Sequence, residues 1–220
     1  MAAPPHPAAG PVTAIRTTRR HLKRDAIARA AIEPLSKRGL RNVTLTDLGA
    51  ELGMSGAHLL YYFESKTDLF MAALRMVERD LRDQALEAFE ALPSARDRWD
   101  HLIETGAPAG LNDSGLLMWL EAWSEAVHDP GMRALISELE QQWQALLVDT
   151  LRYAVARGEL PDSMDVDSTA EGVSALLDGL TIRVIVGYRS LDHAAAMRLV
   201  GQFTSPLLPW REPHDPEGEQ

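Results

Sequence analysis

Apolar residues recur at helical spacing along nearly the whole chain between its two ends. Glycine or proline separates the periodic segments, and no strand-like alternation runs long enough to build a sheet. The predicted helices cover about 18–38, 44–52, 55–61, 65–91, 95–107, 114–128, 130–158, 166–188 and 192–204. The pattern therefore predicts an all-α protein of about nine helices.

Residues 44–70 hold the densest helix-start signals of the chain. Thr44 with Asp47 fits a capping box, in which a hydroxyl and an acid three residues later satisfy each other's backbone amides. Gly53 suits the position just after a helix, and Ser55 suits the N-cap of the next one. A third capped start follows before residue 70. Such close caps leave room only for short helices joined by tight turns, as in a helix-turn-helix.

The charge of this region differs from that of the rest of the chain. Residues 16–66 contain ten Lys and Arg against five Asp and Glu, whereas the whole chain carries a net charge of −10. A basic segment on an acidic protein is suited to binding nucleic acid phosphates. The alternative interpretation is a solvated helix face that happens to be basic.

Composition excludes several classes of protein. A chain of 220 residues that is 45% hydrophobic can bury a core as one large or two small domains. It has no cysteine, which excludes disulfides, thiolate metal sites and a cysteine nucleophile. We expect a cytoplasmic protein, because the first residues lack the pattern of a signal peptide and no apolar run is long enough to span a membrane.

The run from Arg19 to Phe70 resembles the DNA-binding domain of the TetR family of bacterial regulators. The matching stretches are AIARAAIEPLSKRGL, TLTDLGAELGMS and LLYYFESKTDLF. Two later stretches, WLEAWSEAVHDPGMRALISELEQQW and ARGELPDSMDVDSTAEGVSALLDGL, resemble the C-terminal ligand domain of the BetI-like branch. The resemblance implies a homodimeric repressor that binds double-stranded operator DNA and is released by a small-molecule effector.

This resemblance also implies a domain organisation. We expect a disordered arm at 1–16, a helix-turn-helix DNA-binding domain at 17–64, a ligand-binding and dimerisation domain at 65–206, and a flexible tail at 207–220.

The family's DNA contacts map onto the helix-turn-helix. The matching positions are Thr44, Ser55, Gly56, Ala57, His58, Tyr61, Tyr62 and Lys66. Hydroxyl groups and a lysine suit phosphate binding, whereas residues at the start of the recognition helix reach base edges. Two departures stand out: Leu60 occupies a position where the family usually has tyrosine, and Gly56 and Ala57 offer little side chain for reading bases.

Aromatic residues in the middle of the chain suggest an effector cavity between helices. The predicted ligand-binding residues are Trp99, Ile103, Trp119, Trp123, Trp143, Leu147 and Asp178. The alternative is that these residues form only a helical core. Polar residues in apolar surroundings, namely Glu121, Glu125, His128 and Asp178, lead to a further hypothesis, because an acid beside tryptophan suits a cationic ligand.

Two apolar stripes predict the dimer surface. One lies in 166–188 and the other in 192–204; they comprise Val173, Leu176, Leu177, Leu180, Val184 and Ile185, and Ala194–Ala196, Leu199, Val200 and Phe203. Two such helices from each subunit would form a four-helix bundle with two-fold symmetry. The alternative is that both stripes are buried within one subunit.

Signs of enzymatic chemistry are missing from the sequence. The seven histidines show no metal-ligand spacing, and there is neither a phosphate-binding glycine loop nor a GxSxG motif. We therefore predict no catalytic residues, no metal and no cofactor. Two other functions stay open: an effector-independent DNA-binding protein of the same fold, or a ligand-binding helical protein without regulatory DNA binding. The sequence identifies neither the effector nor the operator.

Overall fold

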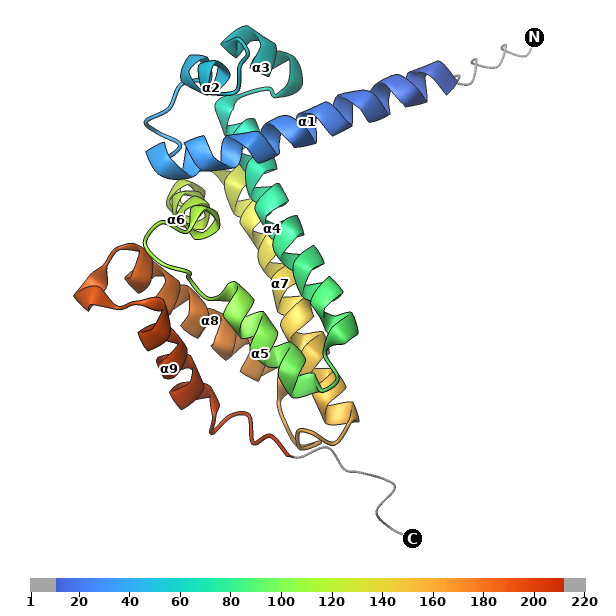
Figure 1. The fold of residues 1–220 in the computed structure, drawn as a ribbon, viewed down its shortest axis with the longest axis vertical. Coiled ribbons are helices and arrows are strands. Elements are labelled where there is room, and N and C mark those ends of the chain that lie inside the picture. Colours follow the sequence, from blue (N-terminus) through green and yellow to red (C-terminus); the bar gives the residue numbers. More distant parts are fainter. Residues whose placement is uncertain (1–10, 212–220) are drawn as a thin grey trace. The chain divides into compact units, whose positions relative to one another are not determined.

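The computed structural model describes residues 11–211, with side chains from Arg20 onward, and this part of the chain is all-α (Figure 1). Its elements are α1 (Pro11–Arg38), α2 (Leu45–Glu51), α3 (Gly56–Tyr62), α4 (Lys66–Ala91), α5 (Ala95–Gly106), α6 (Ser114–Ala126), α7 (Pro130–Ala156), α8 (Val166–Ile185), the 3-10 turn η1 (Tyr188–Ser190) and α9 (His193–Thr204). The prediction of an all-α fold with helices in these places is confirmed; α1 begins seven residues earlier than predicted, and the other helix ends differ by three residues or fewer.

The chain forms two compact units, Met1–Met76 and Val77–Gln220, and their boundary lies inside α4. The sequence places this boundary earlier, near residue 65. It lies later in the structure because the first turns of α4 bury Leu69, Phe70 and Ala73 and so belong to the first unit.

The ends of the chain differ from the expected arm and tail. Helix α1 begins at Pro11, inside the stretch 1–16 that is expected to be an arm, and residues 1–10 lie outside the described part. At the other end, Leu208 is buried, with 3% of its surface exposed, and the amide of Arg211 donates to the carbonyl of Glu159 at 2.9 Å. Residues 207–211 therefore belong to the folded second unit.

The caps predicted in the first unit are present. The Thr44 hydroxyl accepts from the amide of Asp47 at 3.1 Å, and the Asp47 carboxylate accepts from the amide of Thr44 at 2.9 Å. The Ser55 hydroxyl accepts from the amide of His58 at 3.1 Å, and Gly53 has a left-handed φ of +67° after α2. These contacts end α2 and begin α3 within a few residues, which gives the helix-turn-helix.

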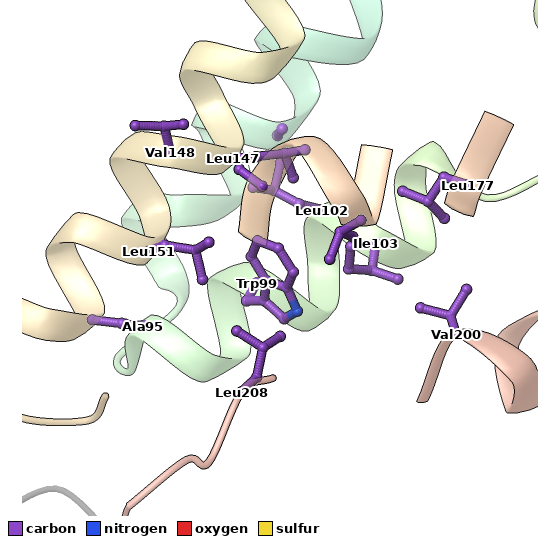
Figure 2. Close-up of a cluster of buried hydrophobic side chains, with 14 of the residues drawn as sticks. Ala95, Trp99, Leu102, Ile103, Leu147, Val148, Leu151, Leu177, Val200 and Leu208 are labelled. Atoms are coloured by element: carbon purple, nitrogen blue, oxygen red, sulfur yellow. The ribbon is translucent and has the colours of Figure 1, made fainter. Parts of the chain in front are cut away.

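The core of the second unit forms where α5, α7 and α8 pack together (Figure 2). Trp99, which is 2% exposed, lies among leucines of α7 and close to Leu208. Burial of such apolar surface provides most of the stability of a helical bundle. No helix in the described residues is long and apolar enough to cross a membrane.

A buried carboxylate links three segments of the second unit. Glu159, 1% exposed, lies between α7 and α8 and accepts hydrogen bonds from the amides of Ala95 (3.0 Å) and Arg96 (3.2 Å) at the start of α5. It also accepts from Arg157 Nε at 2.6 Å. Burial alone would raise the pKa of Glu159, but Arg157 and the two amides outweigh it and hold this pKa below its ordinary value.

We expect Glu159→Gln to lower the free energy of unfolding by about 2 kcal/mol at pH 7, because hydrogen bonds to a charged group are lost or weakened. A carboxylate with a lowered pKa stabilises the fold above its unfolded pKa and loses this effect as the pH falls through its folded pKa. The difference between variant and wild type should therefore shrink below about pH 4.5. Urea denaturation at several pH values measures it. Glu87→Gln, at an exposed site on α4, serves as the control and should change little.

Candidate nucleic-acid interface and effector cavity

Helix α3 has one buried side and one side open to solvent. Leu59 is buried, as is Phe63 just after the helix, and together they anchor it in the first unit. Ala57, His58 and Tyr61 are exposed. The sequence therefore gives α3 the geometry of a recognition helix, with its exposed face free to meet a groove of DNA.

Two arginines of α1 hold the end of α3. Arg20 Nη2 donates to the carbonyl of Tyr61 at 2.9 Å, and its guanidinium lies 5.1 Å from the centre of the Tyr61 ring. Arg24 donates to the carbonyl of Tyr62 at 3.3 Å and pairs with Asp68 at 2.6 Å. The basic part of α1 thus fixes the position of the two tyrosines.

Lys66 lies beside the start of α2. Its Nζ donates to the carbonyl of Val43 at 2.7 Å, so the ammonium group is held next to Thr44 with hydrogens left to donate. The Thr44 hydroxyl donates to Asp47 at 2.5 Å, and this contact, followed by the bond from the Thr44 amide, lowers the pKa of Asp47. Lys66 therefore keeps hydrogens available for a further acceptor, whereas the hydroxyl hydrogen of Thr44 is already donated to Asp47.

The small residues at the start of α3 have a packing reason. A Cβ on Gly56 would lie 3.2 Å from the backbone of Leu45, and a Cβ on Gly49 would lie 2.7 Å from the carbonyl oxygen of Met54. The approach at Gly49 leaves no room for a side chain without moving the backbone, whereas at Gly56 a Cβ would be a tight contact. The small residue at Gly56 thus fits the close packing of α3 on α2.

The second unit contains a cavity of about 110 Å³ among α4, α5, α6, α7 and α8. Its lining residues are Val77, Glu78, Leu81, Thr105, Gly106, Asp113, Gly115, Leu116, Trp119, Trp123, Glu140, Trp143, Leu177, Asp178 and Thr181. Of the predicted ligand residues, the structure brings together Trp119, Trp123, Trp143 and Asp178. The other three, Trp99, Ile103 and Leu147, lie instead in the core (Figure 2).

Besides Asp113, which caps the start of α6, three partly buried carboxylates from three helices line this cavity: Glu78 of α4, Glu140 of α7 and Asp178 of α8. Trp119 Nε1 donates to Glu78 at 2.5 Å, and Trp123 and Glu140 line the cavity together. The rings of Trp119 and Trp123 lie 5.6 Å apart. None of the described residues that line the cavity is basic.

The pKa values of these carboxylates are raised. Burial raises the pKa of Glu78, although the indole of Trp119 opposes this. Burial, followed by the negative charges of Asp178 and Glu78, raises the pKa of Glu140 to about 7. Burial and the charge of Glu171 raise the pKa of Asp178 to about 6. The cavity therefore favours a positive charge in its midst.

Sequence reasoning missed Glu78 and Glu140. Glu140 lies one helical turn before Trp143, and Glu78 lies one turn before Leu81, so each places an acid on an otherwise apolar face. This spacing of an acid on an apolar helix face can be recognised from the sequence alone. The acids chosen from the sequence, Glu121 and Glu125, and also His128, are not among the cavity's lining residues.

A second hollow, wider and about 640 Å³ in volume, lies between α7 and α8. It shares Glu140 and Asp178 with the cavity and adds Asp149, Asp167 and Glu171. Arg152 in this hollow pairs with Asp167 at 3.1 Å. Within residues 11–211, no three His, Asp or Glu side chains lie close enough together to hold a metal ion.

Each of the two units matches a known protein family. Residues 27–73 match the family described as bacterial regulatory proteins, tetR family, and residues 95–209 match the BetI-type transcriptional repressor, C-terminal domain. The chain belongs to the TetR family. It is a transcriptional regulator with the C-terminal domain of the BetI type, as the resemblance in its sequence predicted.

Individual TetR-family relatives match along most of their length. The regulator BetI of Klebsiella pneumoniae is 26% identical over 191 residues, which cover 86% of this chain and 95% of BetI. A transcriptional regulator from Saccharomonospora viridis, solved in complex with choline, is 29% identical, with a TM-score of 0.78; the match covers 87% of this chain and all of that one. A TetR-family regulator from Rhodococcus sp. is 25% identical, with a TM-score of 0.71, over 84% of this chain and 98% of that one.

Proposed function

We propose that this protein is a homodimeric repressor that leaves its operator when a small organic cation of the quaternary ammonium type fills the cavity of the second unit. The observation that carries the proposal is the lining of that cavity, which joins three tryptophans and four carboxylates without a basic residue. Indole faces attract quaternary ammonium groups, and carboxylates neutralise their charge. Choline is a suitable test ligand, since it occupies the similar regulator from Saccharomonospora viridis.

The first unit supplies the DNA contacts of the proposal. His58 and Tyr61 on the exposed face of α3 reach base edges, with Ser55, Ala57 and Tyr62 beside them. Lys66 and Thr44 bind phosphate and set the position of α3 on the duplex. Gly56 contributes its backbone alone.

Lys66→Ala should weaken binding to all DNA sequences alike. A dimer loses one phosphate contact per subunit, so the slope of log Kd against log salt concentration should fall by about two. The measurement is a salt titration with DNA from upstream of the protein's own gene. Lys37→Ala, in an exposed pair with Glu33 at the end of α1, should leave the slope unchanged. An unchanged slope for Lys66→Ala would remove this lysine from the interface.

The proposed dimer surface lies on the exposed faces of α8 and α9. Most of the predicted α8 stripe, including Val173, Leu177 and Val184, is buried within the subunit. Other apolar side chains are left outside: Ile182 is 39% exposed on α8, and Phe203 is 59% exposed on α9. Three glycines on the same helices have open space beside them, because a Cβ added there would meet no described atom within 4 Å; they are Gly172, Gly179 and Gly201. Such small residues allow a partner helix to approach closely.

Ile182→Glu should convert the dimer to a monomer, because it places a charge where two apolar helices meet. Sedimentation at micromolar concentration measures the mass. Leu86→Glu replaces an equally exposed leucine on α4 and should leave the dimer intact. Equal masses for both variants and the wild type would place the interface elsewhere.

Helix α4 offers a route from ligand to DNA. It begins at Lys66 in the first unit and carries Val77, Glu78 and Leu81 into the cavity lining of the second. A ligand that favours a different position of these residues would move the same helix that presents Lys66 to DNA. Ligand and DNA then oppose each other reciprocally, as allostery requires.

Choline should bind the purified protein and lower its affinity for operator DNA. Calorimetry gives the choline affinity, and a gel-shift or anisotropy titration with and without choline gives the change in DNA affinity. Trp119→Ala and Trp123→Ala should each weaken choline binding by about fivefold or more, as expected for loss of a cation–π contact. DNA binding that is tight and indifferent to every cation would favour the effector-independent alternative.

A further inference from the structure

The three carboxylates of the cavity differ in their partners. Glu78 accepts a hydrogen bond from the indole N–H of Trp119, and an interaction with Trp123 counteracts the rise in the pKa of Glu140, so residues of α6 act on one carboxylate of α4 and one of α7. Among the described residues, none donates a hydrogen bond to the carboxylate of Asp178. Asp178 also lines both the cavity and the wider hollow between α7 and α8. It is the carboxylate best able to turn toward a ligand.

We propose that Asp178 is the counter-ion of the effector's ammonium group, and that binding of the cation displaces a proton from the acid group formed by Asp178, Glu140 and Glu78. This inference rests on the proposed function, because it concerns the same cavity and the same class of ligand. Beyond that function, it identifies Asp178 as the carboxylate that contacts the cation and a proton as the species released on binding.

The reason for proton displacement lies in the crowding of like charges. Ionising all three of these carboxylates in one small cavity costs free energy, because their negative charges repel one another. Without a cation between them, they therefore share protons. The negative charges of Asp178 and Glu78 each raise the pKa of Glu140. A cation among them reverses this balance, lowers their pKa values and releases a proton to solvent. No other reactant is needed, since one positive charge replaces another.

The remaining charged groups around the three acids do not supply that cation. Asp113 at the start of α6 lines the cavity, and Glu171 of α8 lies in the adjoining hollow, so both add negative charge. Arg152 pairs with Asp167. Arg82 lies with Glu78 along a third, very small hollow of about 10 Å³ but is not part of the cavity lining.

One histidine has an indirect link to the cavity. The ring of His101 on α5 lies 3.4 Å from the hydroxyl of Thr105, which lines the cavity. His101 itself does not line the cavity, so its replacement provides the matched control for the experiment.

The sign of the pH dependence follows from the raised pKa values. Below about pH 6 Glu140 and Asp178 hold protons, and the cation must displace one; above about pH 7 both are ionised, and the cation enters without displacing a proton. Affinity for a cation should therefore rise with pH, by about tenfold between pH 6 and pH 8 for a single displaced proton with a pKa near 7.

Choline is the probe, because its quaternary ammonium group cannot gain or lose a proton in this range. Calorimetry at pH 6, 7 and 8 should give the tenfold change in Kd. At pH 6.5, repeats in two buffers of different ionisation enthalpy should show a substantial fraction of one proton released per choline bound. The neutral isostere 3,3-dimethylbutan-1-ol, which keeps choline's shape without its charge, should show no such increase in affinity with pH.

Three variants assign the effect to residues. Asp178→Asn should weaken choline binding at pH 8 by at least about tenfold and leave the neutral isostere unaffected. Glu140→Gln should reduce the ratio of the Kd values at pH 6 and pH 8 from about ten to about two or less, because it removes the acid whose pKa is about 7. His101→Gln should keep the wild-type ratio. Thermal unfolding of each variant verifies that it is folded.

The outcomes separate this inference from the proposed function. Choline binding that is independent of pH, or without proton release, overturns proton displacement and leaves the cation sensor in place. Unchanged choline affinity in Asp178→Asn overturns its role as counter-ion. Absence of choline binding at pH 8, where the acids are ionised, overturns both the inference and the proposed class of effector.

Discussion

Placing carboxylates inside a helical bundle is costly unless each one is given a donor, and the second unit is arranged around that constraint. Glu159 accepts hydrogen bonds from two backbone amides and an arginine, Glu78 accepts one from the indole of Trp119, and Glu140 interacts with Trp123. In the first case the donors carry the opposite charge or sit at a helix start, and the acid stays ionised. In the other two the partners are neutral, and the acids remain open to a cation.

This contrast separates a structural acid from a functional one. Both kinds are hydrogen-bonded, so burial alone does not distinguish them. The pKa of Glu159 is lowered by its partners, whereas that of Glu140 is raised by burial and by like charges across a cavity. A binding site is indicated by a carboxylate beside a cavity whose charge has no compensating partner. A carboxylate whose charge is compensated within the fold instead links segments of the chain.

The helix-turn-helix was predictable almost residue by residue, because its signals are local. A capping hydroxyl at Thr44, a glycine at Gly53 and a second cap at Ser55 each act within a few residues along the chain, so the sequence contains the whole interaction. The role of Gly56 was not predictable in this way. Its reason is the approach of α2, and a contact between helices leaves no trace in local spacing.

The sequence predicted a cavity lined by aromatic residues, but it identified only some of the residues that line it. Trp99 and Trp143 look alike in the sequence, yet the first fills the core and the second lines the cavity, with its ring against Gly106, where a Cβ would lie 2.8 Å from it. Which tryptophan meets empty space depends on how five helices pack. The acids Glu78 and Glu140 lie on α4 and α7, far from Asp178 along the chain, so only the folded chain brings them together with it.

The contact between Arg211 and Glu159 gives the end of the chain a structural role. The side chain of Glu159 holds the start of α5 while its carbonyl holds the segment after α9, so one residue fastens both. Leu208 lies against the same core as Trp99. A chain cut at residue 206 would lose that cover and open a route for water to the middle of the bundle, whereas a cut after residue 211 would keep both contacts. The minimal folded form of this regulator therefore extends past its last helix.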